Sequence, residues 1–297
     1  MSPKSATSPH VFAAVFLGAV LLHPSASVTA QCSDAGACTI SRHLELEEAE
    51  RSRTMGLRYT FGVSGSPDDV TYHSVVAEAH LQVLSHSRVI ATLPYNWQRG
   101  PLGSVNGLGD LVAVWDQTFL EWEHRTGRFG VQLGGRFGMG DANAAPGLPM
   151  AYQPGLGSTD LIVGASAVYA ALSGGAAYQV AGARNNNELV RLQRGNQLVL
   201  WGNYRFGWEK TTVVPGITVI NQFQESSVVD TTLGWPATVS VPGSDQLQIN
   251  LGLRATHELS STLVLEFFGA IPLRPRDVNV DGLKRALTLS VGLSTIL

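Results

Sequence analysis

The chain has 297 residues, of which 14% are charged and 44% hydrophobic, and its formal net charge is −3. This weak acidity disfavours a nucleic-acid-binding protein, because nucleic-acid surfaces are recognised by basic patches. A helical membrane protein is also disfavoured, because no apolar run reaches the roughly 18 residues that a spanning helix needs.

Residues 1–30 are typical of a secretory signal peptide. The longest apolar run, VFAAVFLGAVLL, follows a single lysine and precedes a small-residue cleavage site that ends at Ala30. A buried core helix is the alternative interpretation. We expect cleavage at this site and export from the cytoplasm of a Gram-negative-type bacterium.

Residues 31–54 are predicted to form a periplasmic N-terminal tail. Cys32 and Cys38 both lie in it, and an oxidising periplasm favours a disulfide between them. A metal site is the alternative, but no histidine pair lies nearby at ligand spacing. The charged stretch 41–53 is either a short helix or a solvated tail.

Residues 55–297 follow strand periodicity to the C-terminus. Leu57 and Tyr59, for example, alternate with Arg58 and Thr60, which is a period of two and not of 3.6. Twelve such segments are predicted, near 55–64, 72–84, 88–98, 110–123, 128–140, 158–171, 176–184, 196–208, 212–223, 245–256, 262–272 and 283–297. The segment 110–123 is apolar on both faces and 212–223 contains Pro215, so each is a candidate for a β-bulge.

The connections alternate in length, which favours an outer-membrane barrel over a soluble sandwich. Those after odd-numbered segments are long, whereas those after even-numbered segments, such as SHS, HRTG, LSGG and EKT, are short. Outer-membrane barrels have short periplasmic turns and longer extracellular loops. We therefore predict an all-β fold, a transmembrane antiparallel up-and-down β-barrel of about twelve strands whose last strand pairs with the first.

Aromatic residues gather at the predicted strand ends, as expected for the two interfacial girdles of a membrane barrel. The short-turn side is assigned Trp122, Phe129, Tyr169, Tyr178, Phe206 and Trp208, and the long-loop side is assigned Tyr72, Tyr95, Trp97, Phe137 and Phe223.

The inward face carries charged residues of both signs. The main candidates for a role in the lumen are Arg58, Glu78, His80, Arg136, Arg205, Arg254 and Glu266. They form either a self-satisfied network that fills the barrel or the wall of a polar passage. Twelve strands lie between the eight whose interior side chains can fill and the sixteen or more of an aqueous pore. A restricted conduit is the interpretation adopted here.

Two stretches carry a family resemblance, NGLGDL (106–111) and GLGSTDLIVGASAVYAAL (155–172). Both resemble the outer-membrane barrel family named for the MetA pathway of phenol degradation. The resemblance implies a transporter of small organic, often aromatic, compounds. Within these motifs Asp110 and Asp160 are expected to accept hydrogen bonds from loop backbone at the rim, and a structural role is favoured over ligand contact.

The long loops 141–157 and 224–244 carry apolar side chains, among them Tyr152 and Trp235. They are candidates for an apolar lid or binding mouth, with ordinary surface loops as the alternative.

Motifs for catalysis are missing from the sequence. There is no G-x-S-x-G and no H-E-x-x-H, and the spacing of His80, His124 and His257 does not distinguish them from wall or turn residues. We expect no enzyme activity, no cofactor and no metal. The expected partners are outer-membrane lipid, the outer-membrane assembly machinery and a small organic solute. The leading function is passage of small hydrophobic or aromatic compounds, and the alternative is a non-transporting structural or partner-binding barrel.

Overall fold

The structure is a computed structural model that describes residues 53–64, 69–122, 127–230, 236–281 and 286–297. The predicted signal peptide, the cysteine tail and Trp235 lie outside these residues. Among the described residues, no helix is long and apolar enough to cross a membrane.

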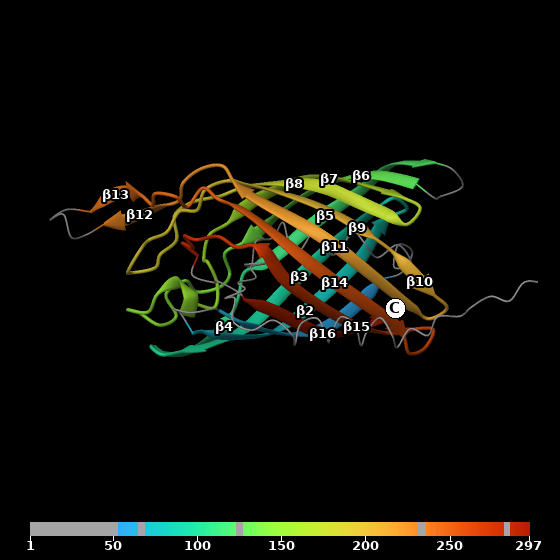
Figure 1. The fold of residues 1–297 in the computed structure, drawn as a ribbon, viewed down its shortest axis with the longest axis horizontal. Coiled ribbons are helices and arrows are strands. Elements are labelled where there is room, and N and C mark those ends of the chain that lie inside the picture. The colour runs from blue at the N-terminus through green and yellow to red at the C-terminus, as the bar shows by residue number, and fades with distance from the viewer. Residues whose placement is uncertain (1–52, 65–68, 123–126, 231–235, 282–285) are drawn as a thin grey trace, which may run out of the picture.

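The described residues form β-strands joined by turns and loops (Figure 1). The strands are β1 (Thr54–Val63), β2 (Thr71–Leu84), β3 (Ser87–Gly100), β4 (Gly103–Leu108), β5 (Leu111–Trp122), β6 (Gly127–Phe137), β7 (Asp160–Tyr169), β8 (Leu172–Val180), β9 (Gln197–Tyr204), β10 (Phe206–Trp208), β11 (Thr211–Gln222), β12 (Ser227–Asp230), β13 (Ala237–Ser240), β14 (Leu247–Glu258), β15 (Leu263–Arg274) and β16 (Leu287–Ile296). One 3-10 turn, η3 (Met150–Tyr152), lies between β6 and β7.

One sheet of fourteen strands closes on itself. Strand β4 pairs only with β3, and β10 extends the line of β9 along β11, so twelve antiparallel strand positions make up the barrel. The last strand, β16, pairs with β1 from Thr54↔Ile296 to Val63↔Leu287. Closure leaves no open edge, so backbone groups are satisfied within the sheet, as a bilayer requires. The fold is a transmembrane β-barrel of outer-membrane type, as predicted.

The two faces of the strands differ as the period of two predicts. Leu57, Trp115, Leu133 and Leu161 are each about half exposed and point outward. Their neighbours along the strands point inward and are buried. An apolar outer surface of this kind is typical of a membrane barrel.

The glycines of β8 explain one error of the sequence analysis. LSGG was assigned to a turn, but the turn falls at residues 170–171 and β8 begins at Leu172. A Cβ atom on Gly175 would meet the Trp201 indole of the adjacent β9, so the glycine leaves space for that ring. Tyr178 therefore lies toward the long-loop end of β8 and not in the short-turn girdle.

Tyr72 was also assigned wrongly. It points inward, is almost completely buried and donates a hydrogen bond from its hydroxyl to Asn96 Oδ1 at 2.8 Å. The other long-loop aromatics, Tyr95, Trp97, Phe137 and Phe223, are exposed on the outside.

Both irregular segments are strands. The β5–β6 pairing shifts register between Thr118 and Leu120. Strand β11 runs unbroken through Pro215, and the interruption falls opposite it, between β9 and β10. Proline has no N–H with which to complete a ladder, which explains the break in the neighbouring strand.

The long connections lie at one end of the barrel and the short turns at the other (Figure 1). The long connections contain structure that was not predicted: β4 extends β3 as a hairpin, and β12 and β13 form a separate two-stranded ribbon.

Candidate functional site

Six buried charges of alternating sign form a chain at the long-loop end of the lumen. In order they are Asp110, Arg136, Asp160, Arg194, Asp281 and Arg276, all at most 8% exposed. Arg136 Nη2 lies 2.7 Å from Asp160 Oδ2, and its Nε lies 3.8 Å from Asp110 Oδ2. Arg194 lies 3.8 Å from Asp160 and 3.4 Å from Asp281, which lies 3.9 Å from Arg276. We call this set the charge chain.

The charge chain crosses the barrel. Asp110, Arg136 and Asp160 belong to the neighbouring strands β5 to β7 or directly precede them, whereas Arg276 and Asp281 lie in the loop between β15 and β16. Equal numbers of arginines and aspartates make the chain neutral. Burial is tolerable because each charge has an opposite neighbour; removal of one would leave its partner buried and unpaired.

Glutamines extend this network along the wall. Gln179 donates to Asp160 Oδ2 at 2.5 Å, and Gln197 donates to Gln179 Oε1 at 2.9 Å. Arg276 donates to Gln222 Oε1 at 3.5 Å on the far side. Amide side chains of β8 and β9 therefore extend the network from Asp160, and Gln222 of β11 extends it from Arg276.

The loop 138–159 packs inward over the charge chain. Its residues 150–156 are all buried, and Asn96 and Gln98 of the inner face of β3 donate to the carbonyl oxygens of Pro154 and Gln153 at 2.6 and 3.2 Å. Tyr152 packs with Val70 and Val105 and accepts a hydrogen bond from the Leu102 N–H. The loop is a packed cover of the long-loop mouth, and Tyr152 lies within that packing.

Asp110 binds both ends of the loop 138–159. Its carboxylate accepts hydrogen bonds from the backbone N–H groups of Gly140 (3.0 Å), Leu156 (2.9 Å) and Gly157 (3.3 Å). Burial raises the pKa of Asp110 above its usual 3.8, although Arg136 and these three hydrogen bonds lower it.

Glycines in the motifs that carry the family resemblance allow the two ends of the loop 138–159 to approach each other beside Asp110. A Cβ on Gly155 would lie 2.6 Å from the Gly140 Cα and 2.9 Å from Asp110 Oδ1, and Gly157 has a φ of 65°. Larger residues would push the two loop segments apart.

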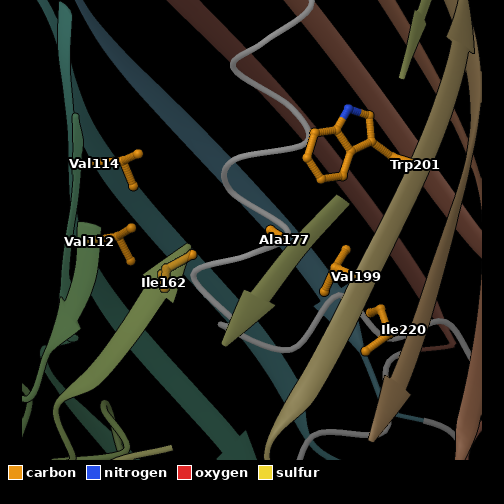
Figure 2. Close-up of a cluster of buried hydrophobic side chains, with 7 residues drawn as sticks. All are labelled: Val112, Val114, Ile162, Ala177, Val199, Trp201 and Ile220. Carbon is orange, nitrogen blue, oxygen red and sulfur yellow. The ribbon is translucent and has the colours of Figure 1, made fainter. Parts of the chain in front are cut away.

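Below the charge chain, one part of the inner wall is apolar. The cluster consists of Val112, Val114, Ile162, Ala177, Val199, Trp201 and Ile220, from strands β5, β7, β8, β9 and β11. Figure 2 shows Val112, Val114 and Ile162 on one side and Val199, Trp201 and Ile220 on the other. Among the residues that the structure describes, the buried Trp201 Nε1–H has no hydrogen-bond partner. We call this set the apolar wall.

The opposite part of the inner wall, from β14 through β16 to β2, is polar. Arg58 Nη2 lies 2.6 Å from Glu78 Oε1, and Arg254 Nε lies 3.9 Å from Glu266 Oε2. Toward the short-turn end this wall borders a cavity of about 260 Å³, which Arg58, Glu78, His80, Arg205 and Glu266 help to line.

The predicted lumen residues thus separate into two groups. Five of them line the short-turn cavity, and Arg254 pairs with one of the five. Arg136 lies instead in the charge chain together with the predicted rim residues Asp110 and Asp160. Within the described residues, no group of three or more His, Cys, Asp or Glu is placed to hold a metal ion.

Sequence reasoning missed part of the site. Arg194, Arg276 and Asp281 lie in loops, where no periodicity marks a residue as inward. Arg88 and Asp116, which form an inward pair at 2.9 Å, do follow the alternation of their strands and were detectable from it. The apolar wall was missed because inward positions were expected to be polar.

Comparisons with known proteins show the fold. No known protein family matches the sequence, and no curated protein matches it. An outer membrane channel from Pseudomonas putida F1 is 15% identical, with a TM-score of 0.58 over 83% of this chain and 96% of that one. The NanC porin is 9% identical, with a TM-score of 0.45 over 83% of this chain and all of that one. A Pseudomonas aeruginosa FadL homologue has a TM-score of 0.41 at 10% identity, over 83% and 89% of the two chains.

Proposed function

We propose that this protein is an outer-membrane channel that passes small organic solutes with a hydrophobic or aromatic part. The observation that carries the proposal is the apolar wall inside the barrel. A water-filled pore for polar solutes has a polar interior, whereas seven apolar residues gather on the inner face here. An apolar solute part would contact this wall while its polar groups face the opposite wall.

The buried arrangement at the long-loop end supports a restricted passage and not a wide pore. The cover 138–159 and the charge chain lie across that mouth, and the six charges of the charge chain are buried. Solutes would pass only where this packing yields. A permanently filled, non-transporting barrel is the alternative, and it predicts no flux at all.

The remaining expectations form part of the proposal. They are cleavage of residues 1–30, a periplasmic tail in which Cys32 and Cys38 form a disulfide, insertion by the outer-membrane assembly machinery, and contact with outer-membrane lipid. The fold shared with the P. putida outer membrane channel supports the outer membrane as the location.

Liposome swelling tests the proposal with solutes that cross lipid slowly. The refolded mature protein is reconstituted, and the rates of entry of L-phenylalanine and L-serine are compared. Both are zwitterions, so only the side chain differs. We expect phenylalanine to enter faster than its larger size alone would allow, because its ring contacts the apolar wall. Equal exclusion of both solutes by a demonstrably folded protein would contradict the proposal.

A matched pair of variants separates the lumen from the outer surface. Val199→Ser changes the apolar wall, and Leu200→Ser changes the adjacent, outward-facing position of the same strand. The preference for phenylalanine should fall in Val199→Ser and persist in Leu200→Ser.

A further inference from the structure

The short-turn cavity contains a buried arginine whose donors are only partly used. Arg58 is 9% exposed and contacts Glu78 through Nη2 alone. Its Nε and Nη1 are buried and have no hydrogen-bond partner among the described residues. Buried N–H groups of a guanidinium without acceptors are costly. A ligand oxygen inside the cavity would satisfy them.

The other charges of the cavity favour an anion over a cation. Its three acidic lining residues are Glu78, Glu258 and Glu266. Arg58 pairs with Glu78 and Arg254 with Glu266, whereas Glu258 is exposed at the rim beside two further lining cations, Arg205 and Lys210. His80 also lines the cavity. Together with Arg254, the partner of Glu266, the cavity has four cations against three carboxylates.

The shape of the cavity leaves room for an apolar part beside the arginine. In the sheet, Gly292 pairs with Arg58 of β1 and with Glu266 of β15, so a residue without a side chain lies between the two charges. Val264 adds an apolar contact. The volume of about 260 Å³ is slightly below the roughly 300 to 1,000 Å³ of pockets for drug-sized ligands, so the ligand must be small.

We propose that this cavity binds the carboxylate of a small organic acid with an apolar body, and that Arg58 is its main ligand. The inference rests on the proposed passage of solutes with an apolar part and specifies that some of them are monocarboxylates. Arg205 and Lys210 at the rim would attract the anion toward the cavity.

Equilibrium binding tests this without any measurement of flux. The dissociation constants of benzoate and benzyl alcohol are measured by ligand-observed NMR with the full mature chain in lipid nanodiscs, and empty nanodiscs serve as the blank. The two probes share a ring and differ in the carboxylate. We expect Arg58→Gln to weaken benzoate binding about tenfold or more, because a charge-assisted hydrogen bond is lost, and to change benzyl alcohol binding less than twofold.

Two further variants guard against misfolding and general charge effects. Arg58→Gln leaves Glu78 unpaired, so the double variant with Glu78→Gln removes both charges and should show the same loss. Arg99→Gln removes an equal charge from an exposed position at the long-loop end of β3, whereas the cavity lies at the short-turn end. This variant should bind benzoate normally. Benzoate binding that is absent from the wild type, or unchanged in Arg58→Gln and in the double variant, would overturn the inference.

The outcomes also separate this inference from the proposed function. Phenylalanine flux without benzoate binding leaves the passage standing and rejects the carboxylate site. Benzoate binding that depends on Arg58, without any flux, supports the site and rejects the passage.

Discussion

Individual side chains decide whether the interior of this barrel is closed at the long-loop end. Arg136 is completely buried, and its guanidinium lies between Asp110, which directly precedes β5, and Asp160, which begins β7. Asp110 in turn joins the start of β5 to both ends of the loop 138–159. Two residues therefore connect three segments that the sequence separates by up to 47 positions.

Replacement of Arg136 by glutamine should strongly destabilise the protein. The shorter neutral side chain leaves Asp110 buried without its cation and leaves Asp160 with only the more distant Arg194, which costs about 3 to 5 kcal/mol. Urea unfolding in detergent measures the effect. Arg99→Gln, an exposed substitution, should change the unfolding free energy by no more than about 0.5 kcal/mol. Similar unfolding midpoints for the two variants would show that the ion pairs of Arg136 contribute little.

Asp110→Asn should change how stability depends on pH. Since the pKa of Asp110 is raised in the folded protein, folding favours its protonated form. Its contribution to stability is fully present below the usual value of 3.8 and is lost as pH rises through the raised pKa. Asparagine does not titrate. The stability advantage of the wild type over the variant should therefore shrink as the pH rises from 3.8 through the raised pKa, as followed by unfolding midpoints. An advantage that grows over this range would contradict the assignment.

At the scale of the strands, the size of the inward side chains and the apolar character of the outward side chains are separate requirements. Strand β8 has alanines and glycines facing β9 because Trp201 occupies the space above them. The alternation itself is preserved, and Tyr178 and Val180 remain exposed on the outer face. In β8, Gly175 thus marks the position of a large neighbour and not a turn.

Gly175→Ala should be destabilising for this reason. The added methyl group would displace the Trp201 ring or bend β8, at a cost of about 1 to 3 kcal/mol. Gly202→Ala is the control, because a Cβ there meets no atom within 4 Å. Thermal unfolding compares the stabilities, and near-ultraviolet circular dichroism reports the tryptophan environment. Equal effects of the two substitutions would mean that Trp201 adapts freely.

The molecule as a whole combines a regular wall with an irregular cover. The twelve strand positions determine the width of the barrel. At the long-loop end, loops from two connections pack together through Ala142, Met150, Leu156 and Leu192, and the partly buried Val228 and Val280 of two further connections pack against them. Access from the long-loop end therefore depends on loops and not on barrel size.

Replacement of residues 143–153 by a short Gly-Ser linker should open that mouth. The change removes the buried segment around Met150 and Tyr152 but keeps the backbone groups that Asp110 binds. Planar-bilayer recordings should then show a larger single-channel conductance than the wild type. Unchanged conductance in a folded variant would show that the constriction lies elsewhere, for example at the apolar wall.

Much of this architecture follows from the sequence alone. Eleven or twelve residues of alternating character, as in Leu247–Glu258, can satisfy both lipid and lumen only as a strand. The alternation therefore determined the strands, their inward faces and the closure of β16 on β1, and it placed Arg58, Glu78, His80 and Arg254 inside. The short connections after every second predicted segment determined which end bears the loops.

Only the tertiary structure decided which inward groups meet. Strand tilt and register bring Arg58 to Glu78 and set Gly292 between Arg58 and Glu266, and neither contact follows from periodicity along one strand. The charge chain depends on loop residues such as Arg194 and Asp281, whose positions are determined by packing and by hydrogen bonds over long sequence separations. Local sequence specifies which face a strand residue occupies, because that is set by the pleat; long-range pairing specifies its neighbours, because that is set by the closure of the whole barrel.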